Sequence, residues 1–224
     1  MIHEMRLYHG SKTGIQGAIR CNSSRNECDF GKGFYTGDKA EQPMGLIAKW
    51  SQHQFYELEC NFDNLNVREF GSTYMEQIDW ALYIGFNRRP DAYSKYEKLC
   101  DRYRCYNSEY DVMIGPIADD KMFKLLDEFF AMRLCDKALL QGLTQVKLGN
   151  QYVFKTEKSC DKNHIQIISE RKLKPDEIRY ATAANNNRSL QTEDILRQLN
   201  ARYRRAQDVK FFDEILEEWN ESYR

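Results

Sequence analysis

The sequence predicts an α+β fold, and three observations support this prediction. Strand-like and helical patterns are mixed along the chain without the regular β-α-β alternation of a parallel sheet. Hydrophobic residues make up 42% of the 224 residues and aromatic residues 13%, which is enough for a real core. Only four prolines and twelve glycines occur, so long disordered linkers are not expected.

The first part of the chain is predicted to contain three short strands and two helices. Period-two patterns bounded by turn residues place the strands at 5–9, 34–36 and 55–60. Residues 12–33, rich in Gly, Ser, Asn and Lys, are expected to form a loop. One helix runs from the capping residue Asp38 to about residue 54. The second covers 75–86, with one apolar face formed by Met75, Ile78, Leu82 and Phe86.

The middle of the chain continues the same mixture. Residues 88–109 are charged and tyrosine-rich, which predicts a helix or a long insertion. A buried strand at 110–114 is stopped by Gly115-Pro116, and Asp119-Asp120 start a helix because acids suit its first turn. Its apolar residues recur at helical spacing: Met122, Leu125, Leu126, Phe129 and Phe130. A further helix is predicted at about 133–143, and further strands at 151–156 and 165–168.

The chain is predicted to divide into a domain over residues 1–170 and a helical C-terminal extension over residues 171–224. The pattern changes from Pro175 onward, and Thr192 opens a helix. A second apolar helical face is formed by Phe211, Phe212, Ile215, Leu216 and Trp219. The extension carries mixed charge, which is typical of a packing or partner surface.

Charge and cysteine content exclude several classes of protein. The 33 basic and 34 acidic residues give a net charge of -1, which argues against a protein that coats nucleic acid or an anionic membrane. No run of about 18 apolar residues occurs, so no membrane span is expected, and the N-terminus lacks the pattern of a signal peptide. Seven scattered cysteines indicate reduced thiols in the cytoplasm. The closest pair, Cys100 and Cys105, has no second pair at zinc spacing, so no metal is expected.

Two short elements carry the strongest indication of chemistry. One is Tyr8-His9-Gly10-Ser11 at the end of the first strand, and the other is residues 29–35, Asp-Phe-Gly-Lys-Gly-Phe-Tyr. Taken singly, His9 is more often a strand-end histidine bonded to backbone, and Phe34-Tyr35 is more often core. The P-loop, the G-x-G-x-x-G, H-E-x-x-H and G-x-S-x-G motifs do not occur.

Together these elements resemble the ADP-ribosyltransferase superfamily, in its poly(ADP-ribose) polymerase-like branch with a His-Tyr-acid triad. The order of motifs is similar to that of a bacterial family within that fold, domain of unknown function 3990. The matching residues cover about 5–170: Tyr8-His9-Gly10-Ser11, residues 29–35, Glu41-Gln42, Tyr110-Asp111, residues 115–120, Gln151, Phe154 and Thr156. The resemblance implies a split antiparallel β-sheet core with flanking helices.

The resemblance also implies a pocket for NAD as the substrate, without a metal. His9 would bond the ribose on the adenosine side, the backbone of Gly10 would hold the nicotinamide carboxamide, and Ser11 would bond the same ribose or amide. Tyr35 would stack on the cationic nicotinamide ring. Gly33 and Phe34 would complete the cofactor-binding set. Stabilising the positive charge on the ribose would be the main catalytic task.

Gln151 occupies the place where the polymerases have a glutamate. An amide can bond the ribose, but it cannot act as a base. This argues against growth of poly(ADP-ribose) chains. It leaves open the transfer of single ADP-ribose units, with Asp119, Asp120, Glu157 or the substrate assisting, and it also leaves open a pseudo-enzyme. Strand alternation puts Gln151 on the face opposite Phe154. Trp50 is expected in the core.

Acceptor choice is expected to depend on loops such as 61–74 and 88–109. In residues 88–106, six basic side chains and four tyrosines interleave, which suits either single-stranded nucleic acid or a solvated amphipathic helix.

The functional hypothesis is a bacterial mono-ADP-ribosyltransferase acting on a protein or nucleic acid, as a toxin or defence effector with an antitoxin protein as candidate partner. The alternatives are an NAD glycohydrolase and a catalytically weak NAD-binding or partner-binding module.

Overall fold

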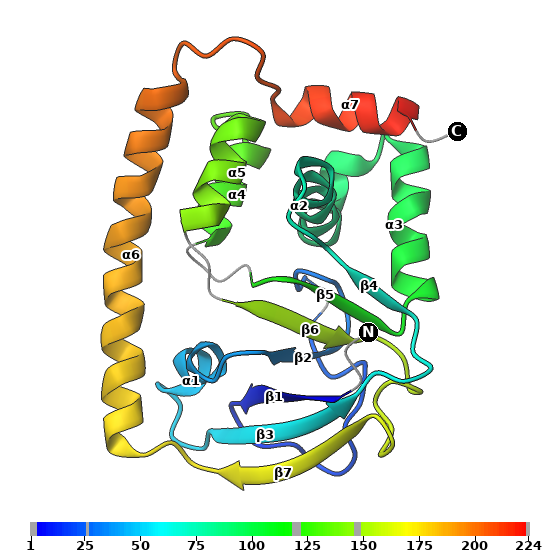
Figure 1. Ribbon diagram of the computed structural model, residues 1–224, viewed down its shortest axis with the longest axis vertical. Coiled ribbons are helices and arrows are strands. Elements are labelled where there is room, and N and C mark those ends of the chain that lie inside the picture. The colour runs from blue at the N-terminus through cyan, green and yellow to red at the C-terminus, as the bar shows by residue number, and fades with distance from the viewer. Residues whose placement is uncertain (1–3, 26, 118–121, 146–148, 223–224) are drawn as a thin grey trace.

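A seven-stranded mixed sheet with helices packed against it confirms the α+β prediction (Figure 1). The computed structural model describes residues 4–25, 27–117, 122–145 and 149–222. In chain order the strands are β1 (Glu4–Ser11), β2 (Phe34–Gly37), β3 (Gln54–Asn61), β4 (Val67–Glu69), β5 (Val112–Pro116), β6 (Asn150–Phe154) and β7 (Ile165–Arg171). Their order across the sheet is β4-β5-β6-β2-β1-β3-β7.

The sheet differs from the expected antiparallel one at a single edge. Neighbouring strands are antiparallel except for β4 and β5, which are parallel. The sequence analysis missed β4, because its three residues are too few for a period-two pattern to emerge.

The helices agree with the predicted positions in most of the chain. They are α1 (Glu41–Ile47), α2 (Tyr74–Arg88), the 3-10 helix η1 (Pro90–Tyr93), α3 (Glu97–Glu109), α4 (Met122–Phe130), α5 (Asp136–Gln145), α6 (Pro175–Tyr203) and α7 (Phe212–Ser222). A capping box between Thr73 and Glu76 starts α2. This start leaves Met75 on the solvent side, 57% exposed, so its predicted place on the apolar face is wrong.

Helix α1 is shorter than predicted because Asp38 does not cap it. The Asp38 carboxylate instead accepts a hydrogen bond from the backbone N–H of Asn150, 3.0 Å away. This bond joins the end of β2 to the start of β6, and α1 begins only at Glu41. The chain then has to return as β3 from Gln54.

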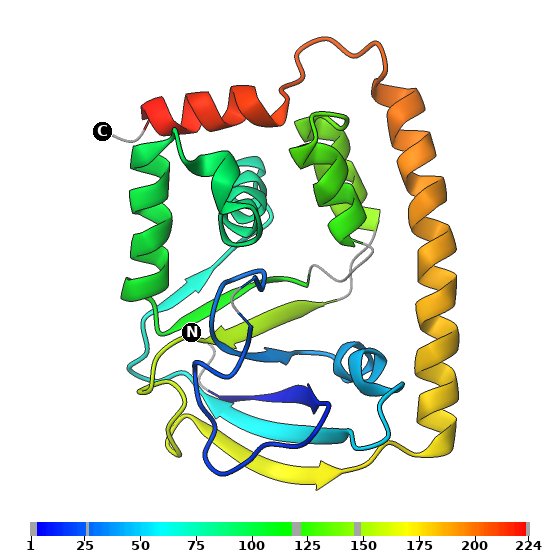
Figure 2. The ribbon, with the colours of Figure 1, turned by 180° about the vertical axis from the view of Figure 1, so that it is seen from behind.

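The sheet buries apolar residues on both faces. One face carries Met113 and Val153 into a core formed with α2, α3, α4, α5 and α7. The other face carries Leu7, Phe34 and Phe154. It is covered by the loop between β1 and β2, which crosses the sheet in Figure 2.

Strands β1 and β2 are joined by a single residue pair. Within the described residues their register contains only Tyr8 opposite Gly37, whereas β1 pairs with β3 along its whole length, from Glu4 opposite Asn61 to Ser11 opposite Gln54. The sheet therefore consists of two halves, β4-β5-β6-β2 and β1-β3-β7, which meet at this junction.

The C-terminal helices complete the core. Helix α6 begins at Pro175 rather than Thr192, because proline suits the first turn of a helix, where it loses no hydrogen bond. Ile178 packs beside α1 and Leu199 joins the core near α5. The core residues of α7 are Phe212, Ile215, Leu216 and Trp219, while Phe211 is exposed, contrary to its predicted place.

No helix among the described residues has the length and apolar character needed to cross a membrane.

Candidate functional site

His9 lies at the junction between β1 and β2, with its ring against Phe34 at a centroid distance of 4.5 Å. Its Nδ1 is 2.7 Å from the carbonyl oxygen of Tyr35. A carbonyl oxygen only accepts, so Nδ1 must carry the proton in this bond. Burial lowers the pKa of His9 from 6.5. The imidazole is therefore neutral near pH 7, and its Nε2 is a hydrogen-bond acceptor.

Tyr35 offers its ring rather than its hydroxyl group. The hydroxyl donates to the carbonyl oxygen of Gly31 at 2.7 Å and accepts from the backbone N–H of Phe30 at 3.0 Å. Burial raises the pKa of Tyr35 well above 10. The hydroxyl group is thus fixed in the turn that precedes β2, and the half-buried aromatic ring is the part that remains for contact with a ligand.

Gln151 lies on the same face of the sheet as Tyr35. Tyr35 is opposite Val153 and Gly37 is opposite Gln151, so Tyr35 and Gln151 are diagonal neighbours, a relation that puts their Cβ atoms roughly 7–8 Å apart. Gly115 flanks Gln151 on the other strand. Both cross-strand neighbours of Gln151 therefore lack side chains.

The turn before β2 folds onto Gln151. The Gln151 side chain is only 6% exposed, and its Nε2 donates to Oδ2 of Asp29 and to the carbonyl oxygen of Pro116, each at 3.0 Å. Asp29 also forms an ion pair with Arg88. The sequence analysis missed the roles of Asp29 and Arg88, although Asp29 belongs to a motif that it had singled out.

The remaining predicted site residues have packing partners of their own. A Cβ on Gly10 would lie 2.7 Å from the Pro43 carbonyl oxygen in α1, and one on Gly33 would lie 2.3 Å from Val153. Both glycines are thus required by close packing. The Oγ of Ser11 accepts from the N–H of Thr13 at 3.4 Å.

The structure brings the ring of His9 to the backbone of Tyr35, but separates that ring from the side chains of both Tyr35 and Gln151. His9 contacts Phe34 and Tyr56, which belong to one face of the sheet, whereas the register places Tyr35 and Gln151 on the other. The two sets adjoin at the junction, where His9 bonds to the backbone of Tyr35.

Of the predicted assisting acids, the structure describes only Glu157. Asp119 and Asp120 lie outside the described residues. Glu157 is exposed and its carboxylate accepts a hydrogen bond from the thiol of Cys21. Trp50 is 42% exposed with the Lys12 ammonium 4.6 Å from its ring centre, so the prediction that it lies in the core is wrong.

Of the two interpretations of the tyrosine-rich segment, the structure favours the amphipathic helix, with the tyrosines packed in the core. The four tyrosines are buried: Tyr93, Tyr96, Tyr103 and Tyr106. Rings in the core cannot stack on nucleotide bases. Arg102 of this segment instead pairs with the buried carboxylate of Asp79.

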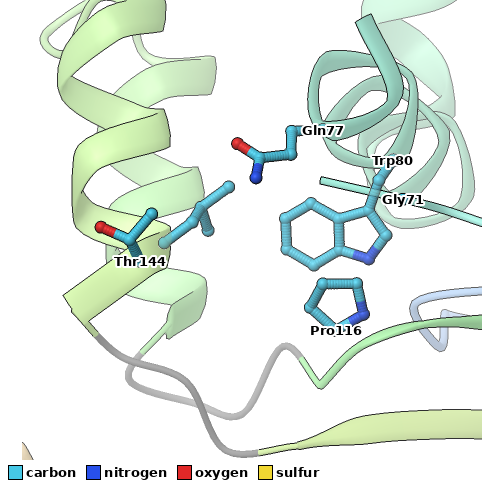
Figure 3. A pocket seen from close by; sticks show the side chains of 6 residues that line it. Gly71, Gln77, Trp80, Pro116 and Thr144 are labelled. Carbon is cyan, nitrogen blue, oxygen red and sulfur yellow. The ribbon is translucent and has the colours of Figure 1, made fainter. Parts of the chain in front are cut away.

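A small cavity of about 40 Å³ lies next to Pro116, near the Gln151 side chain (Figure 3). It is lined by Gly71, Gln77, Trp80, Pro116, Leu143 and Thr144. None of the predicted site residues lines it, but it reaches Pro116, whose carbonyl oxygen accepts the bond from Gln151.

Among the described residues, no group of three or more His, Cys, Asp or Glu side chains is arranged to hold a metal ion. The model of a family described as a protein of unknown function, DUF3990, matches residues 5–164. This segment contains β1 to β6 and α1 to α5 and ends just before β7. No curated protein and no solved structure gives a significant match.

Proposed function

We propose that this chain, which belongs to the DUF3990 family, is a mono-ADP-ribosyltransferase that transfers ADP-ribose from NAD to a protein or nucleic-acid acceptor. The observation that carries the proposal is the fixed state of His9 at the junction of β1 and β2. Its Nδ1–H donates to the carbonyl oxygen of Tyr35, which leaves the neutral Nε2 to accept a hydrogen bond from a ribose hydroxyl group.

The backbone of β1 beside His9 fits the amide end of the same substrate. Because β1 and β2 pair at Tyr8 only within the described residues, the stretch from His9 to Ser11 has no registered partner on the β2 side. An unpaired strand backbone offers both N–H donors and carbonyl acceptors. These groups match a carboxamide, which has one acceptor and two donor hydrogens.

Tyr35 and Gln151 supply the other two contacts. The Tyr35 ring, fixed through its hydroxyl, suits stacking on a cationic aromatic ring. The reaction breaks the bond between nicotinamide and ribose, and positive charge builds up on the ribose. An amide oxygen from Gln151 would stabilise that charge but would not remove a proton from the acceptor. Because Gln151 cannot act as a base, we propose that single ADP-ribose units are transferred to an acceptor that is already nucleophilic.

The amide at position 151 also favours a second candidate, a catalytically weak NAD-binding or partner-binding module. Both donor hydrogens of Gln151 are used within the protein, and this side chain offers no carboxylate to assist the acceptor. An NAD glycohydrolase would use the same contacts with water as the acceptor.

The partners remain proposals with unequal support. The buried tyrosines remove the base-stacking argument for a nucleic-acid acceptor, so a protein acceptor is the better-supported class. Action as a toxin or defence effector restrained by an antitoxin protein is proposed from the resemblance of the motifs.

The test is incubation of the purified full chain with labelled NAD and a cell lysate. Label on a macromolecule supports transfer, and free ADP-ribose without a labelled acceptor supports hydrolysis. Binding measured by calorimetry without turnover supports the binding module. A purified chain that shows no turnover and no binding of NAD would rule out both enzyme hypotheses and the NAD-binding module.

The matched variants are His9→Ala and His164→Ala. His164 has the same type of bond, from Nδ1 to the carbonyl oxygen of Asn61 at 2.9 Å, but lies in the segment between β6 and β7. We expect His9→Ala to lower the rate of nicotinamide release by about tenfold or more, the loss expected for one hydrogen bond in a buried site. His164→Ala should leave the rate within about twofold of wild type. Equal effects of the two substitutions would contradict the role of His9.

A further inference from the structure

We infer that Asp29 is a positioning residue for the proposed reaction, acting by turning the Gln151 amide so that its carbonyl oxygen Oε1 faces the ribose. This inference rests on the proposed function. It adds a residue that neither the motif resemblance nor the family match assigns to the site.

The orientation of the Gln151 amide follows from the nature of its two partners. Oδ2 of Asp29 and the carbonyl oxygen of Pro116 both lie 3.0 Å from Nε2. A carboxylate and a carbonyl can only accept, so the NH2 group must face them. Rotation of the amide by 180° would bring Oε1 against two acceptors and lose both bonds. Oε1 is therefore held on the opposite side of the amide, where it accepts no bond from the described residues.

Asp29 is itself fixed by its surroundings. The carboxylate is buried, and Arg88 forms an ion pair with its Oδ1. The guanidinium group of Arg88 lies over the Phe123 ring at 3.8 Å. The backbone carbonyl of Asp29 accepts a bond from Asn87 at 3.1 Å. A buried carboxylate held by a guanidinium group is a rigid acceptor, and hydrogen bonds to it are stronger than neutral ones.

The two carboxylate oxygens of Asp29 bind different residues. Oδ1 binds Arg88, and Oδ2 binds Gln151. An asparagine at this position has one acceptor oxygen and one NH2 group, so it can satisfy only one of these donors. Asp29→Asn therefore removes the orienting bond while it changes the side-chain volume very little.

The oriented amide gives Gln151 a function suited to this reaction. Tyr35 and Gln151 share one face of the sheet as diagonal neighbours. On the β2 side of Gln151, a Cβ on Gly37 would meet its nearest atom only at 3.5 Å, whereas on the β5 side the rings of Phe30, Phe70 and Trp80 pack over Gly115. A carbonyl oxygen fixed in this position presents partial negative charge to the ribose as positive charge develops. Preorganised dipoles of this kind lower the barrier because they need no reorientation during the reaction.

The test is a double-mutant cycle of Asp29→Asn and Gln151→Ala, with kcat and KM for nicotinamide release from NAD. We expect Asp29→Asn to lower kcat about tenfold and to leave KM within about twofold, because the contact strengthens in the transition state. In the Gln151→Ala background, Asp29→Asn should have no further effect on kcat. The loss of thermal stability caused by weakening the Arg88 pair should persist in both backgrounds.

The control is Asp79→Asn, which disturbs another buried carboxylate that binds arginine. It should lower stability without changing kcat. A loss of kcat by Asp29→Asn that is equal in both backgrounds, or an increase in KM alone, would overturn the inference and leave the proposed function standing. A wild-type chain that neither binds nor turns over NAD would overturn both.

Discussion

Lys155 is a half-buried lysine whose amine donates hydrogen bonds to neutral oxygens. Its Nζ donates to the carbonyl oxygen of Phe30 and to Oδ1 of Asn107, the latter at 2.8 Å. Burial lowers the pKa of Lys155 from 10.5 to about 8. The amine helps to fix the turn that carries Tyr35, and it lies close enough to Gly31 to contact a Cβ at that position.

This setting predicts a pH dependence of stability. Between pH about 8 and 10.5 the unfolded chain holds the Lys155 proton and the folded chain does not. The free energy of unfolding therefore rises with pH across this window, and the contribution is lost as the pH falls through about 8. Chemical denaturation of wild type and Lys155→Met should show a difference that changes with pH in this sense. The control is Lys162→Met at an exposed position, whose stability should vary with pH as that of wild type does. A difference between wild type and Lys155→Met that does not change with pH would contradict the prediction.

At the scale of elements, helices α2 and α3 are joined through the buried carboxylate of Asp79. Asp79 accepts bonds from Tyr103 at 3.2 Å and Tyr106 at 2.8 Å. Arg68 and Arg102 pair with Oδ2 at 3.0 and 3.2 Å. One carboxylate thus links β4, α2 and α3, which explains why a charged and tyrosine-rich helix packs into the core.

Removal of this charge should destabilise the fold strongly. Asp79→Asn removes the carboxylate charge that pairs with two half-buried guanidinium groups, and breaking a buried ion pair costs about 3–5 kcal/mol. The control is Asp127→Asn, which breaks the exposed pair with Arg89 and should cost less than about 1 kcal/mol. Urea unfolding of the three proteins measures both values, and similar losses for the two variants would show that the Asp79 network adds little.

At the scale of the molecule, the C-terminal helices belong to the same core as the domain that precedes them. Trp219 of α7 is buried, and Phe212 packs against Phe129 and Phe130 of α4 with ring centroids 5.4 and 5.0 Å apart. Helix α6 connects the α1 end of the sheet with the helical layer (Figure 1).

Truncation of the Trp219 side chain should therefore destabilise the whole fold. We expect Trp219→Ala to lower the free energy of unfolding by about 3–5 kcal/mol, as for other large aromatic residues in cores. Tyr180→Ala, at an exposed position of α6, should change it by less than about 0.5 kcal/mol. Unfolding followed by circular dichroism checks both values. Loss of α7 alone, with the sheet unchanged, would contradict a shared core.

The sequence was sufficient where local patterns determine structure. The spacing of Met122, Leu125, Leu126, Phe129 and Phe130 predicted the buried face of α4, and all five are buried. The sequence was insufficient where a contact between residues far apart in the chain determines where an element begins or ends. Asp38 looked like a helix cap, but it bonds to Asn150, which no local pattern can indicate. Thr192 looked like a helix start, but packing of α6 on both α1 and α5 keeps the helix continuous through it.

The candidate site shows the same division. Strand alternation predicted that Gln151 and Phe154 lie on opposite faces, and their separate partners confirm it. The link from Gln151 to Asp29 spans 122 residues of chain and could not be predicted without the fold. Basic residues interleaved with tyrosines suggested a binding surface, but the buried partner that explains them, Asp79, lies on a different helix.

The order of the strands has a consequence for how the chain folds as it is synthesised. On the side away from β1, strand β2 pairs with β6, and Thr36 and Tyr152 of these strands are 116 residues apart in the chain. Strand β3 pairs on its side away from β1 with β7, and Tyr56 and Glu170 are 114 residues apart. Pairings of this range form slowly. Until β6 and β7 have been synthesised, the nascent chain therefore carries two unpaired strand edges, and such edges expose a folding chain to aggregation.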